Sequence, residues 1–126
     1  MLQRVLESQQ DAIRAHAMDK YPFECCGVIT ADTGEIVRCD NLAENKSQHF
    51  VIGRHAFARL ERYRGIAAVY HSHINQGSNP STEDKDNAPW LAGKTYIIVS
   101  VIGGIAQNPR VYYVGGDGKL RRYGEL

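Results

Sequence analysis

Apolar side chains recur at helical spacing in two stretches of the chain, residues 2–18 and 54–64. In each stretch they form one stripe, which is typical of an amphipathic helix packed against a core. The first helix should end before Pro22, because the residue that precedes a proline disfavours the helical region. Gly65 follows the second stretch, where a left-handed cap residue belongs. The pattern therefore predicts one helix in each stretch.

Two longer apolar runs, residues 66–73 and 95–102, predict central strands. The first half of one run and most of the other are apolar on both faces, as in strands that are covered on both sides. Shorter runs predict further strands at residues 24–31, 35–42, 48–52, 111–114 and 119–123. Turn residues separate the first two and the last two of these, so each pair is expected to form a hairpin. The last strand is rich in Lys and Arg, which suits the edge of a sheet.

A short helix is predicted over residues 81–88, where Pro89 ends it, and Gly103 and Gly104 are expected to form a turn. The predicted fold class is α/β, with one mixed β-sheet that has a helix on each side. The length of 126 residues is that of one domain, so residues 1–126 are expected to form a single unit.

The composition narrows the classes of function. Hydrophobic residues make up 43% and charged residues 23% of the chain, as in ordinary globular proteins. The net charge of +1 gives no electrostatic reason to expect nucleic acid or an anionic membrane as a partner. No apolar run approaches the length of a membrane span and residues 1–17 lack a signal-peptide core, so a cytoplasmic location is expected. Three cysteines, two of them adjacent, make a poor disulfide framework and fit a reducing compartment.

Two histidines, His71 and His73, close the first central strand. Because side chains alternate along a strand, both point to the same face. Asp84 lies just inside the predicted short helix, and two imidazoles with one carboxylate suit zinc and leave a fourth position for water. Each part also has an ordinary explanation, because His-x-His occurs at strand ends without a metal, and Ser81 with Asp84 fits a helix capping box. The combination is what favours a metal site.

A metal site that hydrolyses a bond also needs a base to move protons between water and leaving group. Glu24 is the candidate, because it heads an apolar strand and small residues follow it. An acid at such a position is either a surface residue or an active-site group, and the residues alone leave both readings open.

Five residues in their sequence contexts resemble the signature of the JAMM (MPN+) metalloprotease family, in its prokaryotic JAB-type single-domain form. They are Glu24 within Pro-Phe-Glu-Cys-Cys-Gly-Val-Ile, the pair His71-x-His73, and Ser81-x-x-Asp84 after a gap of seven residues. The resemblance covers nearly the whole chain, because the predicted elements come in the family's order. It implies a JAMM/MPN-like fold with a cytidine-deaminase-like core.

The resemblance also implies a role for each matched position. His71, His73 and Asp84 would bind Zn²⁺. Glu24 would hold the activated water, take its proton and pass it to the leaving amine. Ser81 would donate a hydrogen bond to the oxyanion of the tetrahedral intermediate.

The function that the resemblance implies is zinc-dependent hydrolysis of peptide or isopeptide bonds, at the C-terminal tail of a ubiquitin-like or sulfur-carrier protein. A homodimer is a further option. The chain also resembles the JAMM domain of phage tail assembly proteins, which is a second context for the same chemistry. A third reading is a non-catalytic MPN scaffold, although such relatives typically lose metal ligands. One position departs from the family, because Ile74 follows the second histidine where a proline is common, and this should change loop rigidity and substrate fit.

Other catalytic chemistries have weaker signals. Cys25 and Cys26 would suit a thiol protease, but no Cys-His-Asn pattern accompanies them, so they are expected to be packing residues. Zinc deaminases use His-x-Glu with Pro-Cys-x-x-Cys, and many zinc proteases use His-Glu-x-x-His. Neither pattern occurs in the chain.

The remaining histidines and the single tryptophan have no clear catalytic signal. His16, His49 and His55 are expected at the surface. Trp90 and Leu91 follow the short helix and are expected to pack in the core or in a lid, with a substrate-facing role as the alternative.

Overall fold

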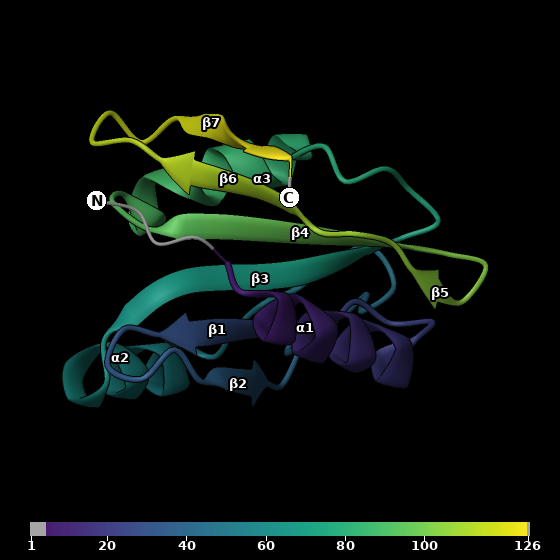
Figure 1. The fold of residues 1–126 in the computed structure, drawn as a ribbon, viewed down its shortest axis with the longest axis horizontal. Coiled ribbons are helices and arrows are strands. Elements are labelled where there is room, and N and C mark those ends of the chain that lie inside the picture. Colours follow the sequence, from purple (N-terminus) through teal and green to yellow (C-terminus); the bar gives the residue numbers. More distant parts are fainter. Residues whose placement is uncertain (1–4, 126) are drawn as a thin grey trace.

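The computed structural model describes residues 5–125. Within this range seven strands form one sheet in the order β2-β1-β3-β4-β6-β7, with β5 paired to β4 (Figure 1). The strands are β1 (Cys26–Thr30), β2 (Ile36–Cys39), β3 (Ile66–Ile74), β4 (Thr95–Ile102), β5 (Ile105–Ala106), β6 (Arg110–Val114) and β7 (Leu120–Glu125). The helices are α1 (Glu7–Lys20), α2 (Arg54–Tyr63), α3 (Thr82–Asn87) and the 3₁₀ helix η1 (Ala88–Leu91).

The two long apolar runs form the centre of the sheet, as predicted. β3 and β4 lie side by side and parallel, and nearly all their side chains are buried. The other pairings are antiparallel, including the hairpins β1–β2 and β6–β7. β7, with its two Arg side chains, lies at one edge and β2 at the other.

Helices cover both faces of the sheet, which confirms the predicted architecture. In Figure 1 α1 lies in front of the sheet, and α2 and α3 lie behind it. Ile13 and Ala17 of α1 pack against the β3 and β4 side chains of the front face. Phe57 and Leu60 of α2 pack against those of the other face. The β3 and β4 backbone is therefore enclosed up to the strand ends, where the polar residues begin.

The prediction that His16 lies at the surface is wrong. Its side chain is 1% exposed on the inner side of α1, and its Nδ1 lies 2.6 Å from the hydroxyl oxygen of Tyr70. Residue 16 is three positions after Ile13, so it belongs to the same buried stripe of the helix. Gly27 makes room for the Tyr70 ring, because a Cβ at this position would lie 2.4 Å from the phenol oxygen.

The predicted strand at residues 48–52 is also wrong, because this segment has no strand assignment. Its backbone groups bond elsewhere. The side chain of Asn41 donates to the His49 carbonyl and accepts from the Val51 N–H, and the Val51 carbonyl accepts from the Leu42 N–H. These bonds occupy backbone groups that a strand would use to pair with a neighbouring strand.

Other differences from the predicted elements are small. Residues 2–4 of the first predicted helix lie outside the described residues, and α1 continues to Lys20, because Tyr21 before the proline is the first extended residue. β1 starts two residues later than predicted. Gly103 and Gly104 form the predicted turn with positive φ angles of 57° and 83°, and the short β5 follows it.

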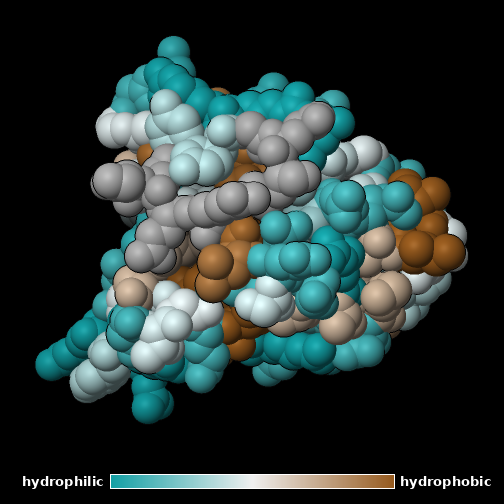
Figure 2. Space-filling view, in the orientation of Figure 1, coloured by the Kyte–Doolittle hydropathy of each residue, from teal (hydrophilic) through white to brown (hydrophobic). Residues whose placement is uncertain are grey.

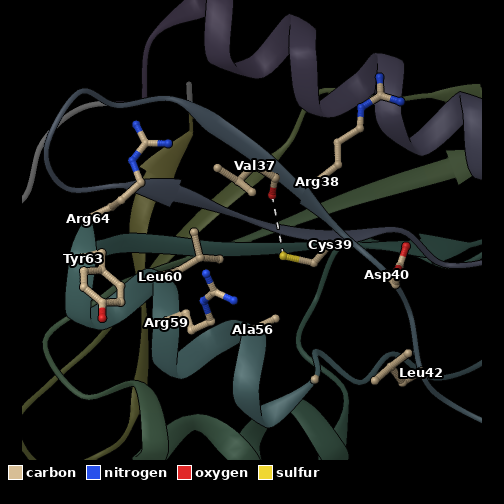
Figure 3. A pocket seen from close by; sticks show the side chains of 11 residues that line it. Val37, Arg38, Cys39, Asp40, Leu42, Ala56, Arg59, Leu60, Tyr63 and Arg64 are labelled. Carbon is tan, nitrogen blue, oxygen red and sulfur yellow. Dashed lines mark hydrogen bonds between the residues drawn. The ribbon is translucent and has the colours of Figure 1, made fainter.

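Much of the front face of the molecule is polar, and one group of apolar residues lies at the β5 end (Figure 2). Ile102 and Ile105 there are 47% and 65% exposed. A groove of 540 Å³ runs between β2 and α2, with Val37 and Leu60 on facing walls (Figure 3). It contains none of the predicted site residues. None of the helices within residues 5–125 is long and apolar enough to cross a membrane.

Candidate metal centre

The C-terminal end of β3 and the start of α3 bring the three predicted ligands together. His71 Nε2 lies 3.3 Å from Asp84 Oδ1, and His73 Nε2 lies 3.2 Å from Asp84 Oδ2. The three side chains are buried, and their ligand atoms lie within 4.8 Å of one another. They form the one group of His, Cys, Asp or Glu side chains within residues 5–125 that could hold a metal ion.

The spacing of these atoms fits a metal ion. For bonds of about 2.0–2.2 Å, two ligand atoms in a tetrahedral site lie about 3.3–3.6 Å apart. The two N–O distances are close to this range. Two imidazoles and a carboxylate are also donors that zinc and related divalent metals accept. The residues present therefore fit the metal that the sequence predicts.

Further contacts hold the three side chains in place. The Gly77 carbonyl can only accept, so His73 Nδ1, 2.8 Å away, donates its hydrogen there and leaves Nε2 free to bind a metal. The Tyr96 hydroxyl donates to Asp84 Oδ1 at 2.7 Å. The ring of Phe50 stacks on that of His71, with centroids 4.2 Å apart. Hydrogen bonds thus orient His73 and Asp84, whereas His71 is held by ring stacking and its Nδ1 has no partner among the described residues.

Ser81 and Asp84 form the capping box that their spacing predicts. The Ser81 hydroxyl accepts a hydrogen bond from the Asp84 N–H at 3.1 Å, and Asp84 Oδ2 accepts one from the Ser81 N–H at 2.8 Å. The cap uses only an acceptor position of the hydroxyl. Within residues 5–125 its hydrogen has no acceptor, so Ser81 retains a donor for a substrate oxygen.

Glu24 lies in the wall of the same cavity. Its side chain is 3% exposed and lines a 30 Å³ space together with His71, His73, Ser81 and Asp84. This is room for about one water molecule or an ion. The alternative that Glu24 is a surface residue is therefore excluded.

The backbone on both sides of the Glu24 side chain is tied down. The Glu24 N–H donates to the Lys46 carbonyl at 2.7 Å, and the following N–H, of Cys25, donates to the Ser72 hydroxyl at 2.8 Å. The Glu24 carbonyl accepts from the Asn41 side chain at 3.0 Å. The carboxyl group is thus held over the cluster by a backbone that cannot move freely.

The enclosed position changes the acidity of the carboxyl groups. Burial raises the pKa of Glu24 to about 8, although the neighbouring His73 opposes this shift. Burial alone would also raise the pKa of Asp84, but the imidazoles of His71 and His73 beside its two oxygens hold it well below its usual range. A cation bound at the cluster would favour the ionised form of Glu24, which is the form that accepts a proton.

Some residues of the site were not predicted from the sequence. Asn41 bonds to Glu24, Phe50 stacks on His71 and Tyr96 bonds to Asp84. Nothing in the local sequence around Asn41, Phe50 and Tyr96 marks them as site residues. His49 is half-exposed, as predicted, but lines the cavity, and its Nδ1 lies 2.6 Å from Glu83 Oε2. This pair joins the 48–52 segment to α3 across the cavity.

The alternatives considered for the cysteines and the tryptophan have clear outcomes. Cys25 and Cys26 are free thiols in the core, and burial raises their pKa values to about 11 and 12. They are packing residues as predicted, because a thiol of such high pKa is a poor nucleophile at neutral pH. The expectation of core packing for Trp90 is wrong, since its side chain is 85% exposed.

Comparison with known proteins gives the family. The model of prokaryotic homologs of the JAB domain matches residues 6–113, so the chain belongs to this family. A curated relative, the tail tip assembly protein K of Escherichia phage N15, is 38% identical over 78 residues. The match covers 60% of this chain but 32% of that protein, so the chain spans about a third of its relative.

Solved structures show the same fold. A Desulfitobacterium hafniense protein has a TM-score of 0.73 at 20% identity, over 95% of this chain and 88% of that one. A Salinibacter ruber protein has a TM-score of 0.66 at 26% identity, over 98% and 90%. A JAB1/MPN domain protein from Archaeoglobus fulgidus has a TM-score of 0.57 at 18% identity, over 90% and 87%. The resemblance stated from the sequence and the predicted fold class are both confirmed.

Proposed function

We propose that the protein is a zinc-dependent peptidase or isopeptidase of the JAMM type. One observation carries this proposal. The proposed base Glu24 and the proposed oxyanion donor Ser81 line the same small cavity as the three residues that could bind a metal. A scaffold protein has no need to enclose a carboxyl group and an unused hydroxyl donor beside such a cluster.

Each residue has a chemical role in this proposal. His71, His73 and Asp84 would hold the ion. Bound there, Zn²⁺ would polarise the substrate carbonyl and lower the pKa of a water molecule toward neutrality. Glu24 would orient the attacking water and carry its proton to the leaving amine. Ser81 would donate its hydroxyl hydrogen to the developing oxyanion.

The substrate that we propose is the flexible C-terminal tail of a ubiquitin-like or sulfur-carrier protein. The cavity of 30 Å³ supports a substrate with small side chains next to the scissile bond, which an extended tail can supply. β2 offers a free sheet edge, because within residues 5–125 it pairs with β1 alone. An extended tail could add to such an edge.

A second context is favoured by the relative named tail tip assembly protein K. In this alternative the same chemistry acts on a protein of a phage tail. The catalytic residues and the metal are the same in both contexts, so the substrate alone separates them.

The test combines a metal assay with a substrate panel. Purified protein is assayed for zinc by mass spectrometry. It is then incubated with ubiquitin-like, sulfur-carrier and phage tail-tip protein fusions, with and without chelator, and the products are read by intact mass. We expect one zinc per chain and cleavage that chelator stops and added Zn²⁺ restores. Asp84→Asn should lose the zinc, while Asp86→Asn, an exposed aspartate on the same helix, should keep it.

The outcomes separate the hypotheses. Zinc with cleavage of carrier tails alone supports the first context, and cleavage of tail-tip fusions alone supports the second. A wild-type protein that binds no zinc contradicts the proposal and leaves the non-catalytic scaffold.

A further inference from the structure

A second hollow adjoins the metal centre. Its volume is 380 Å³, and it shares three lining residues with the small cavity, namely Phe50, Glu83 and Asp84. The rest of its wall is mostly apolar, with side chains from the 50–52 segment, α2, β3, β4 and η1. A peptide that extends from the scissile bond along this wall would enter the hollow directly.

Trp90 forms part of this wall and is 85% exposed. Val51, which also lines the hollow, is 48% exposed. Neither side chain is needed to fill the core, and an exposed indole beside a polar site is an unusual place for so large an apolar surface. Both side chains have apolar surface available for a ligand.

The hollow also offers hydrogen-bond donors. Arg54 and Asn87 line it, and their side chains have no hydrogen-bond or ion-pair partner among the described residues. Both can donate to backbone carbonyl groups of an extended peptide. An apolar wall with a few polar groups is the usual composition of a site that binds a small apolar group.

We propose that this hollow, which we name the Trp90 pocket, binds one apolar side chain of the substrate, with the indole of Trp90 packed over it. The inference rests on the proposed function, because it takes the substrate to be a peptide cleaved at the metal centre. The small cavity at the metal has room only for small groups, so the apolar residue lies near the scissile bond but not beside it. Trp90 is then a specificity-determining residue.

The occupant is a branched aliphatic or aromatic side chain of the substrate and not a second copy of this chain. The hollow of 380 Å³ has the size of a pocket for a small group and not of a docking face for a folded chain, and it shares three lining residues with the cavity of the metal centre. A copy of the chain seated there would cover that cavity. Self-association that depends on Trp90 and blocks cleavage would therefore overturn the proposal.

The chain has a built-in reporter for this pocket, because Trp90 is its only tryptophan. The probes are octapeptides, each with leucine at one position in a background of glycine, alanine and serine. They are titrated into the zinc-loaded Glu24→Gln variant, so that binding is measured without turnover. We expect a saturable blue shift of the tryptophan emission with leucine at one particular position. The peptide with serine at that position should give no shift.

The second measurement is steady-state kinetics, made in proteins that keep Glu24 so that cleavage can be followed. Trp90→Ala should lower kcat/KM about 10- to 200-fold for the leucine peptide and leave the serine peptide unchanged. Its zinc content and its circular dichroism should equal those of the wild type. Tyr63→Ala is the matched control, because Tyr63 is a 70% exposed aromatic residue of α2 that does not line the pocket.

The results distinguish this inference from the proposed function. Cleavage without preference for an apolar residue at any position, and without a change in Trp90 emission, overturns the pocket and leaves the hydrolase. A saturable shift without cleavage of any peptide supports the pocket as a binding site and contradicts the hydrolase. The absence of both shift and cleavage overturns both.

Discussion

Buried histidines occur on both faces of the sheet, and their surroundings differ. On the α1 face His16 contacts the phenol of Tyr70, and its Nε2 has no partner among the described residues. On the opposite face His71 and His73 share the carboxylate of Asp84 at the mouth of a small cavity. The α1 face encloses one neutral imidazole. The opposite face places two imidazoles and a carboxylate, all possible metal ligands, around a small cavity.

The difference shows which surroundings allow buried histidines to hold a metal ion. Burial lowers the pKa of His16 to about 4, so the side chain is neutral at physiological pH and contributes packing and one hydrogen bond. His71 and His73 are also buried, but each presents Nε2 to an anion. The carboxylate and the space beside it, not burial, distinguish the second group.

Removing one histidine from each face should give opposite results, and this is the largest expected effect. His73→Ala should lose the zinc and all cleavage, because a ligand is gone. His16→Ala should keep the zinc but lower the free energy of unfolding by about 2–4 kcal/mol, since it leaves a cavity and an unpaired Tyr70 hydroxyl. Zinc analysis and urea unfolding of the two variants measure both effects. If a folded His16→Ala variant also lost its zinc, the proposed difference between the two faces would be wrong.

Glu24→Gln should lower kcat by about 10²- to 10⁴-fold, because it removes the proposed proton acceptor. The amide has nearly the same shape, so zinc content and the unfolding curve should change little. Steady-state kinetics measure the effect, with Glu61→Gln on the exposed side of α2 as a control that should remain active. Cleavage by Glu24→Gln at the wild-type rate would refute the assignment of the base.

The α1 face should make stability depend on pH. The pKa of His16 is about 4 in the folded state against an ordinary 6.5, so between these values the unfolded state binds more protons. The free energy of unfolding should therefore rise with pH over this range. The contribution of His16 is about 3 kcal/mol, complete above about pH 6.5 and lost as the pH falls toward 4.

Urea unfolding at several pH values tests this dependence, with His16→Asn as the comparison, since asparagine keeps a hydrogen-bonding side chain but does not titrate. The variant should lose this part of the pH dependence, while any part that comes from the opposite face remains. Equal slopes in the two proteins would count against a buried neutral His16.

The smallest predicted effect concerns the support of a ligand. Tyr96→Phe removes the hydroxyl that bonds Asp84 and should weaken zinc binding about 10- to 100-fold. Tyr70→Phe removes a phenol from the opposite face and should lower stability while leaving zinc affinity unchanged. Titration with a competing chelator measures both affinities. Equal weakening in the two variants would mean that the effect is not specific to the metal face.

Much of the fold follows from local periodicity. The run 95–102 coincides with β4, because nearly every side chain of this strand is buried. Residues 54–64 coincide with α2 to within one residue, because Phe57 and Leu60 lie on the stripe that faces the core. The site residues were predicted because the His-x-His and Ser-x-x-Asp spacings are local. Glu24 needed the family resemblance, because its neighbours allow two readings.

What the sequence did not predict depends on distant partners. Residues 48–52 form a short, mostly apolar run that predicts a strand, but the Asn41 side chain binds two of their backbone groups. His16 lies in the apolar stripe of its helix, but its burial depends on Tyr70, far away in the chain. Trp90 is apolar, and the local sequence pattern does not reveal that the side chain of this residue faces solvent.

The side chain of Asn41 ties the backbone of Glu24 to the segment that carries Phe50, on one side of the small cavity. It makes four hydrogen bonds, to the carbonyls of Glu24 and His49 and from the N–H groups of Ala43 and Val51, so every donor and acceptor of the amide is used. Glu24, the proposed base, and the segment that carries Phe50 are therefore held together as one rigid wall of the cavity. On the other side of the cavity, Glu83 of α3 contacts His49 of this wall. Such a half-exposed pair contributes about 0–1 kcal/mol. A substrate that enters between the two walls would separate His49 from Glu83, whereas the Tyr96 hydroxyl would keep Asp84 and the start of α3 in place.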